Sequence, residues 1–215
     1  MDGYGTAGLP LVTFRAARNT AASPSALQAG DNIVTFGGIG YGATAYGGDR
    51  VKFLAVASEN WTDTAQGTQI ALQVTPVGST TIGTAITIGN DSSLTGAGGI
   101  KSTHATKGIG YSTGAGGTVT QLTSRTTGVT LNTVSGAITL FSAAGSTTPA
   151  TFTVTNSAVA ATDTIILNQK SGTNLYILLV TAVAAGSFNV TVYTTGGTTA
   201  EAPVINFAVL KAVTA

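Results

Sequence analysis

Hydrophobic and polar residues alternate with a period of two along several stretches of the chain. In "TQIALQVT", residues 68–75, Ile70, Leu72 and Val74 share one face, while polar or small residues occupy the other. The same alternation predicts strands at residues 83–88, 151–156, 163–169 and 187–195. Turn-forming Gly, Asn and Asp residues separate these stretches, and no window keeps the 3.6-residue period of a helix. Many short strands bounded by turns predict an all-β fold.

Two further stretches are apolar on both faces. They are "LYILLVTAV" at residues 175–183 and "PVINFAVL" at residues 203–210. A strand of a β-sandwich turns only one face toward the core. We therefore expect a neighbouring subunit to cover the second face.

A segment rich in small residues, 96–117, divides the predicted strands into two groups. It contains the motif Gly-Ala-Gly-Gly twice, at Gly96–Gly99 and Gly114–Gly117. Such composition is typical of a connector. The sequence predicts two small modules resembling β-sandwiches or jelly rolls, at residues 1–95 and 118–215, joined by a Gly/Thr-rich linker at 96–117.

The chain carries unusually few charges. Charged residues make up 8% of its 215 residues, whereas about 25% is typical of soluble domains. A monomer with so few charges tends to associate, so we expect an obligate oligomer whose surface is partly covered by other chains. The net charge of +1 gives no electrostatic reason to bind nucleic acid.

The sequence shows no cysteine, no signal peptide and no membrane-spanning stretch. There is no cysteine, so disulfides and thiolate metal sites are excluded. The residues after Met1 have neither the basic nor the apolar region of a signal peptide. The longest apolar run, residues 175–185, is shorter than the roughly 20 residues of a membrane-spanning helix. We expect neither ordinary secretion nor membrane insertion.

Residues suited to catalysis are scarce. His104, the single histidine, lies in the glycine-rich linker, where a general base is difficult to hold in place. Glu59 and Asp63 flank Trp61 as a glycosidase pair could, but no second aromatic cluster forms a sugar cleft beside them. "GYGTAG", Gly3–Gly8, matches a dinucleotide motif only in its letters. No catalytic residue, cofactor or metal ligand is predicted.

The first 90 residues resemble a segment of tailed-bacteriophage fibre proteins. The resemblance rests on ordered blocks: Arg15 and Arg18, "TAASP" at Thr20–Pro24, "AGD" at Ala29–Asp31, Gly40-Tyr41, "ENWT" at Glu59–Thr62, Gly67, and "TPVGSTT" at Thr75–Thr81. The resemblance implies an intertwined homotrimer. The rest of the chain is similar to a small β domain of phage and prophage structural proteins.

Within such an assembly, some residues are candidates for contacts between subunits. The trimer-interface candidates are Trp61, Arg15, Arg18, Tyr41 and Phe207. Trp61 could be an anchor between chains or a core tryptophan under a loop of its own chain. Arg15 and Arg18 could pair with Asp31 or Asp49 of another subunit, or lie along an edge strand.

Turns of the second module are candidates for receptor contacts, because its strands are needed for packing. The candidate turns are Asn168–Asn174 and Thr194–Thr199, with Asn168, Lys170, Asn174 and Thr195 as contact residues. The alternative is that both turns are plain hairpin connections.

These observations predict a non-enzymatic virion protein. The first hypothesis is a trimeric tail or head fibre that contacts other virion proteins and a host surface glycan or protein. The second is a capsid decoration protein that stabilises the head lattice. The third, a virion-associated depolymerase, has no acid and base residues to support it.

Overall fold

The computed structural model describes residues 12–106, 108–197 and 199–212. These residues form fifteen β-strands and no helix, so the all-β prediction is confirmed. The chain divides into two compact units, Met1–Ala105 and Thr106–Ala215. The division lies within the segment 96–117 that the sequence singles out as a connector. No helix in the described part of the chain is long and apolar enough to cross a membrane.

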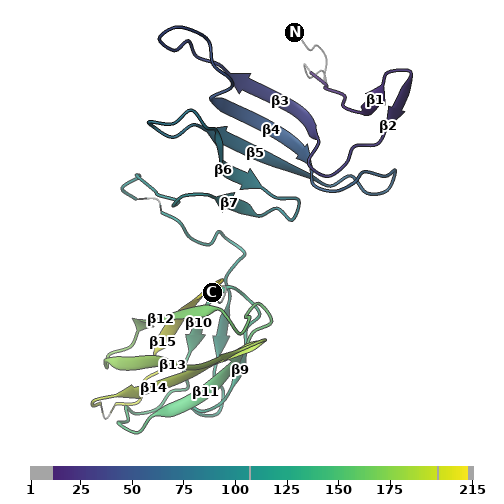
Figure 1. Cartoon of the computed structure of the whole chain (residues 1–215). Helices are drawn as coiled ribbons and strands as arrows, with labels where there is room; N and C mark the ends of the chain where they lie inside the picture. Colours follow the sequence, from purple (N-terminus) through teal and green to yellow (C-terminus); the bar gives the residue numbers. More distant parts are fainter. Residues whose placement is uncertain (1–11, 107, 198, 213–215) are drawn as a thin grey trace, which may run out of the picture. The chain divides into compact units, whose positions relative to one another are not determined.

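The first unit contains a single antiparallel sheet and a separate hairpin (Figure 1). The hairpin pairs β1 (Arg18–Thr20) with β2 (Ser23–Ser25). The sheet has the order β3-β4-β5-β6-β7, in which each strand pairs with the next along the chain. Its strands are β3 (Asn32–Gly38), β4 (Val51–Ala57), β5 (Thr68–Val74), β6 (Gly83–Ile88) and β7 (Leu94–Gly96).

Turn residues fix the connections of this sheet. Gly78, between β5 and β6, has a φ of 78°, a conformation that costs glycine little. Between β6 and β7, the Asp91 carboxylate accepts a hydrogen bond from the Ser93 amide at 3.0 Å, which closes the turn. The Ser93 side chain, followed by this amide, lowers the pKa of Asp91. Short turns of this kind produce a meander of neighbouring strands.

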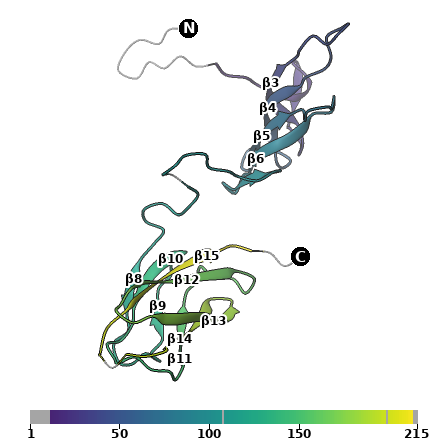
Figure 2. The same ribbon diagram turned by 90° about the vertical axis from the view of Figure 1, so that its left-hand side faces the viewer.

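The second unit is a sandwich of two four-stranded sheets, seen as two layers in Figure 2. One sheet has the order β12-β15-β10-β8 and the other β13-β14-β11-β9. The strands are β8 (Thr118–Thr120), β9 (Val129–Thr130), β10 (Ser135–Thr139), β11 (Ala150–Thr155), β12 (Thr164–Ser171), β13 (Tyr176–Ala184), β14 (Ser187–Thr194) and β15 (Val204–Leu210). Most pairs are antiparallel, but β8 runs parallel to β10, and β9 runs parallel to β11.

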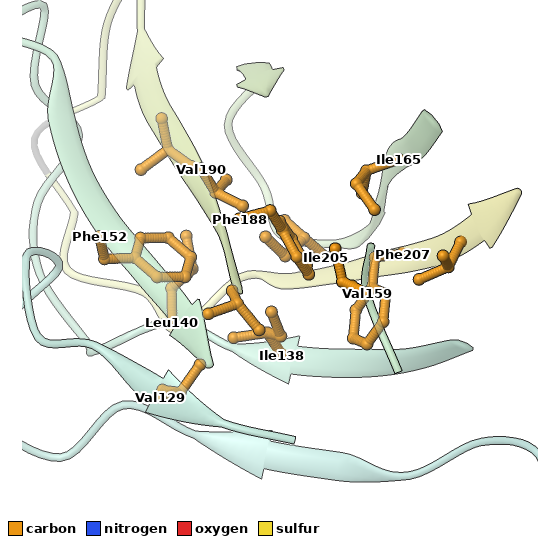
Figure 3. Packing of buried hydrophobic residues seen from close by; sticks show 13 residues of the cluster. Val129, Ile138, Leu140, Phe152, Val159, Ile165, Phe188, Val190, Ile205 and Phe207 are labelled. Atoms are coloured by element: carbon orange, nitrogen blue, oxygen red, sulfur yellow. The ribbon is translucent and has the colours of Figure 1, made fainter. Parts of the chain in front are cut away.

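Alternating apolar residues of both sheets form the core of the sandwich (Figure 3). Phe188 from one sheet and Phe207 from the other are 1% and 3% exposed, and their ring centroids are 5.4 Å apart. Thirteen buried hydrophobic residues belong to this cluster. The sandwich therefore has a substantial core of its own.

The first unit differs, because it forms one layer where the sequence predicts a second sandwich. Its buried hydrophobic residues in the described range are Leu27, Leu54, Ala57 and Ala71. A single sheet can bury only what its own loops and the β1–β2 hairpin cover, so most of its large side chains stay exposed within one chain.

The two stretches that are apolar on both faces form β13 and β15, one in each sheet of the sandwich. On β15, Ile205, Phe207 and Val209 are buried in the core, and the alternate residues are half-buried on the outer face up to Ala208. On β13, Tyr176 is buried, while Leu179 on the outer face is 45% exposed. Within one chain the second faces of these strands are only partly covered.

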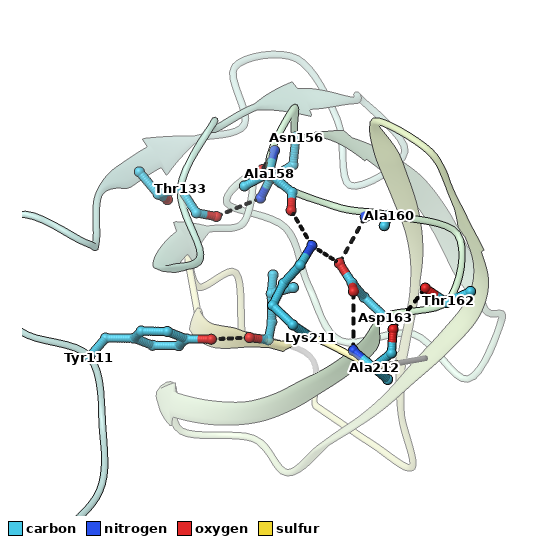
Figure 4. Close-up of polar contacts among 10 residues, drawn as sticks. Tyr111, Thr133, Asn156, Ala158, Ala160, Thr162, Asp163, Lys211 and Ala212 are labelled. Atoms are coloured by element: carbon cyan, nitrogen blue, oxygen red, sulfur yellow. Dashed lines mark hydrogen bonds and ion pairs between the residues drawn. The ribbon is translucent and has the colours of Figure 1, made fainter. Parts of the chain in front are cut away.

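The chain enters the sandwich at the end where β15 finishes. The Tyr111 hydroxyl donates to the carbonyl oxygen of Val209, and the Ala137 amide donates to the Gly117 oxygen at 2.9 Å. At the same end, the buried Asp163 carboxylate accepts from the Ala160 amide at 2.8 Å and from Lys211 Nζ at 2.5 Å (Figure 4). The last described residues are thereby fastened beside the incoming segment.

Candidate functional site

One face of the five-stranded sheet is an exposed hydrophobic surface. Phe36 pairs with Phe53, Phe53 with Leu72, and Leu72 with Ile86, so one apolar row crosses four strands. We call this surface the apolar face, and it consists of Phe36, Val51, Phe53, Leu72, Val74, Ile86, Ile88 and Leu94. Each of these residues is between 36% and 60% exposed.

The size of the apolar face sets it apart from scattered surface hydrophobics. Eight large side chains at this exposure leave roughly 600 Å² of apolar surface in water, as much as the largest patch of a typical monomer. Phe14 adds to it, because its ring meets that of Phe36 edge-on with centroids 5.4 Å apart. A continuous patch of this kind is typical of a surface that another chain covers.

Charge is excluded from this face. Across strands β3 to β7 the single charged residue is Lys52, which lies on the opposite face and pairs with Asp49 at 3.0 Å. Thr35 and Gln73 share that opposite face, which also includes the buried residues Leu54 and Ala71. The two faces of the same sheet therefore have opposite character, and only one of them is suited to burial against an apolar partner.

Trp61 lies at the end of this unit, half-buried against its own chain. Its Nε1 donates to the Gly67 carbonyl oxygen at 3.1 Å, and its main-chain amide donates to the Leu27 oxygen at 2.9 Å. Leu27 is only 4% exposed. The indole also lines a hollow of about 260 Å³ together with Pro24. Trp61 thus anchors a loop within one chain, which is the alternative that the sequence leaves open.

Arg18 forms its ion pair within the chain. Its guanidinium contacts both carboxylate oxygens of Asp31, at 2.6 and 2.8 Å. Asp31 also accepts from the Gln28 amide at 2.8 Å. The Arg18 guanidinium, with the Gln28 amide, lowers the pKa of Asp31 to about 2. This bidentate pair fixes the β1–β2 hairpin to the start of the sheet.

The remaining interface candidates occupy three different environments. Arg15 is exposed. Tyr41 is 63% exposed, contacts Tyr46 edge-on with centroids 5.0 Å apart, and donates its hydroxyl to the Thr44 oxygen at 2.9 Å. Phe207 corrects the prediction, because it is 3% exposed inside the sandwich core and has no surface to offer another chain. Its strand is apolar on both faces, so the sequence alone does not reveal which residues point inward.

Four loops meet at the end of the sandwich opposite Tyr111. They are residues 121–128, 140–149, 172–175, and 195–197 with 199–203, and we call them the loop platform. β15 begins beside this platform at Val204 and finishes beside Tyr111 at Leu210. Seven residues of extended strand, about 20 Å, thus separate the two ends.

The Glu201 carboxylate organises the loop between β12 and β13. It accepts from the Thr173 amide at 2.5 Å, from the Asn174 amide at 3.0 Å and from Asn174 Nδ2 at 2.7 Å. The Tyr176 hydroxyl adds a fourth bond at 3.1 Å. These donors, the Thr173 amide first, lower the pKa of Glu201 from 4.5 to about 2.

Arg125 ties the other loops of the platform together. Its guanidinium donates to the carbonyl oxygens of Phe141 at 3.2 Å, Ala143 at 2.7 Å and Glu201 at 3.0 Å. It also lies over the Tyr176 ring, 5.0 Å from the centroid. Arg125, from the 121–128 loop, and Glu201 thus bind backbone groups of the other three loops. Only their tertiary contacts reveal this role.

The receptor-contact candidates all lie at or near this platform. Asn168 is exposed but belongs to β12, since its backbone pairs with Asn206 and the strand continues to Ser171. The predicted turn is therefore shorter than 168–174. Lys170 and Thr195 are exposed, while Asn174 is half-buried and bonded to Glu201. A hollow of about 400 Å³ is lined by residues 169–175.

The weak catalytic candidates lie in loops outside the named strands. Glu59 closes a turn by accepting from the Gly67 amide at 2.5 Å, and Asp63 is exposed. His104 is exposed in the segment before the sandwich. No group of three potential metal ligands occurs among the described residues. The Gly3–Gly8 motif lies outside the residues that the structure describes.

Comparisons with known proteins give a limited likeness. No family model matches the chain, and no curated protein does. A structure of the carboxy-terminal domain of the bacteriophage T5 L-shaped tail fibre matches with a TM-score of 0.40 at 17% identity, covering 49% of this chain and 44% of that one. The same domain with its intramolecular chaperone domain matches with the same score and identity, covering 50% of this chain and 30% of that one. The chain thus spans less than half the length of either structure.

Proposed function

We propose that this chain is a non-enzymatic structural protein of a bacteriophage virion, a trimeric surface fibre that contributes to host attachment. The observation that carries the proposal is the apolar face. Roughly 600 Å² of uncharged, aliphatic and aromatic surface is left exposed by the described residues, and a stable interface buries about 800 Å² per partner. A second and a third copy of the same face are the partners that match it in chemistry.

Three copies also match the composition of the whole chain. The strands of the five-stranded sheet and of both sandwich sheets contain only two charged residues, Lys52 and Lys170. Without charges on exposed strands, a monomer has little protection against association. A closed trimer solves this problem, because three sheets that turn their apolar faces inward form a finite assembly. The resemblance of the first 90 residues to phage fibres supports three copies over two.

The mass of the native protein tests the assembly directly. Native mass spectrometry and sedimentation at micromolar concentration are expected to give three times the chain mass of 21.2 kDa. A stable, soluble monomer would contradict the trimer.

The position of the protein on the particle tests the fibre role. Electron microscopy of virions is expected to show its density on projecting fibres. Density at many capsid lattice positions would instead support the decoration role, in which the same trimer clamps neighbouring capsid subunits.

A further inference from the structure

Four of the charged residues of the sandwich have polar partners in the described part of the chain, and one does not. Between residues 118 and 212 there are five of them: Arg125, Asp163, Lys170, Glu201 and Lys211. Arg125 and Glu201 hold the loop platform, and Asp163 pairs with Lys211 at 2.5 Å at the opposite end. Lys170 alone has no polar partner among the described residues. It is exposed and lines the hollow of the platform.

Three further side chains that line this hollow make no polar contact within the described fold. The hydroxyls of Ser171 and Thr173 make no hydrogen bond to the described part of the chain, and both residues are exposed. Leu175 is 75% exposed at the same place. One cation, two hydroxyls and one apolar side chain therefore surround a hollow of about 400 Å³.

The hollow is also held in shape before any ligand arrives. Glu201 fixes the Thr173 and Asn174 amides, and Gln169 Nε2 donates to the Asn174 oxygen at 2.7 Å. The Gln169 side-chain oxygen accepts from the Tyr176 amide at 2.9 Å. A loop ordered in advance loses less conformational entropy on binding. These bonds make Glu201 and Gln169 positioning residues for the hollow.

We infer that this hollow binds an acidic, polyhydroxylated glycan of the host surface, an inference that rests on the proposed attachment role. Sugar hydroxyls pair with the Ser171 and Thr173 hydroxyls, and a C–H face of the sugar covers Leu175. The Lys170 ammonium binds a carboxylate or phosphate substituent of the glycan by a charge-assisted hydrogen bond. A neutral glycan would leave this cation without a partner.

Binding to a glycan array tests the ligand class. The full-length protein is applied to bacterial surface polysaccharides that include uronic-acid, phosphorylated and neutral members. Retention is expected on acidic members only, and Lys170→Gln should weaken it about tenfold or more, the range of a hydrogen bond to a charged group. Lys101→Gln is the matched control, because it removes an exposed lysine outside the sandwich strands. Equal binding to neutral glycans, no binding to any glycan, or unchanged binding by Lys170→Gln would overturn the inference.

A second measurement separates a glycan from a protein receptor. Host cells treated with periodate, which cleaves sugar diols, should adsorb the protein poorly, while protease-treated cells should adsorb it normally. The reverse pattern would show a protein receptor and overturn the inference. The variants are also weighed by native mass spectrometry. If the unmodified protein is a trimer that binds no acidic glycan, only this inference is refuted. If the unmodified protein is a monomer, the proposed function is refuted.

The positioning role of Glu201 has its own readout. Glu201→Gln replaces one carboxylate oxygen with an NH₂ group, which cannot accept a hydrogen bond from the backbone N–H of Thr173 or Asn174. Hydrogen exchange at these two amides should then accelerate while core amides such as that of Val190 stay protected, and glycan binding should fall in parallel. Faster exchange with full binding would show that the preformed loop is not needed.

Discussion

The indole Nε1–H of Trp61 donates a hydrogen bond to the main-chain oxygen of Gly67, 3.1 Å away in the same chain. This bond explains how a polar, turn-rich stretch accommodates the single tryptophan. The main-chain amide of Trp61 also donates to the Leu27 oxygen, which holds the loop that follows β4, and the half-buried side chain lines a hollow with Pro24. Trp61 therefore stabilises the local fold and remains accessible to a neighbouring chain.

Trp61→Ala is expected to lower the free energy of unfolding by about 1–3 kcal/mol, less than the 3–5 kcal/mol of a fully buried aromatic. Assembly should weaken more than strand content, because the misplaced loop flanks the apolar face. Trp61→Phe keeps an aromatic ring but loses the hydrogen bond to Gly67, so its free energy of unfolding should lie between those of Trp61→Ala and the unmodified protein. Circular dichroism and native mass spectrometry check both effects. Unchanged assembly of Trp61→Ala would make the residue peripheral to the interface.

The apolar face can be tested with lysines on the two sides of one sheet. Leu72→Lys places an ammonium in the centre of the face, and burying it unpaired costs several kcal/mol. The concentration needed for half-maximal assembly should rise by about a hundredfold or more. Thr35→Lys is the matched control, because Thr35 is exposed on the opposite face and should leave assembly unchanged. Sedimentation measures both variants, and equal behaviour would exclude this face as the interface.

Phe207→Ala distinguishes the sandwich core from an interface. The side chain is 3% exposed and packs on Phe188, so its truncation should destabilise the sandwich by about 3–5 kcal/mol. The variant should still assemble through the first unit. Thermal unfolding and native mass spectrometry give the two readouts. If the variant is a monomer and its sandwich keeps its stability, Phe207 is an interface residue and not a core residue.

The loop platform should depend on acid in a defined direction. Because the Glu201 pKa is lowered from 4.5 to about 2 in the folded chain, its stabilising bonds are fully present above pH 4.5 and are lost as pH falls toward 2. Protection of the Thr173 and Asn174 amides, corrected for intrinsic exchange, should decline across that window. Glu201→Gln should abolish this pH dependence. A flat profile in the unmodified protein would show that the carboxylate does not control the loop.

The strands that were predicted from alternation are present because alternation is a local property. Residues 68–75 and 187–195 correspond to β5 and β14, since side chains two apart point to one side of any extended backbone. The turn at 168–174 was predicted too long, because pairing of Asn168 with Asn206 extends β12 through Ser171. A distant strand provides that pairing, and the local sequence does not encode it.

Local pattern also leaves the partner of each face undecided. The strand at 203–210 is apolar on both sides, and only packing against the opposite sheet turned Phe207 inward. The sheet at 32–96 shows the converse, because its alternation is clear but its apolar face stays exposed among the described residues of its unit.

The candidate site depends still more on tertiary structure. Arg125 and Glu201 are 76 residues apart in sequence, and Glu201 and Asn174 are 27 apart. Each pair meets because the sandwich brings four loops to one end. The preference for strand is set by each residue and its near neighbours, whereas these charges gain their roles from carbonyl and amide groups that only the folded chain places around them.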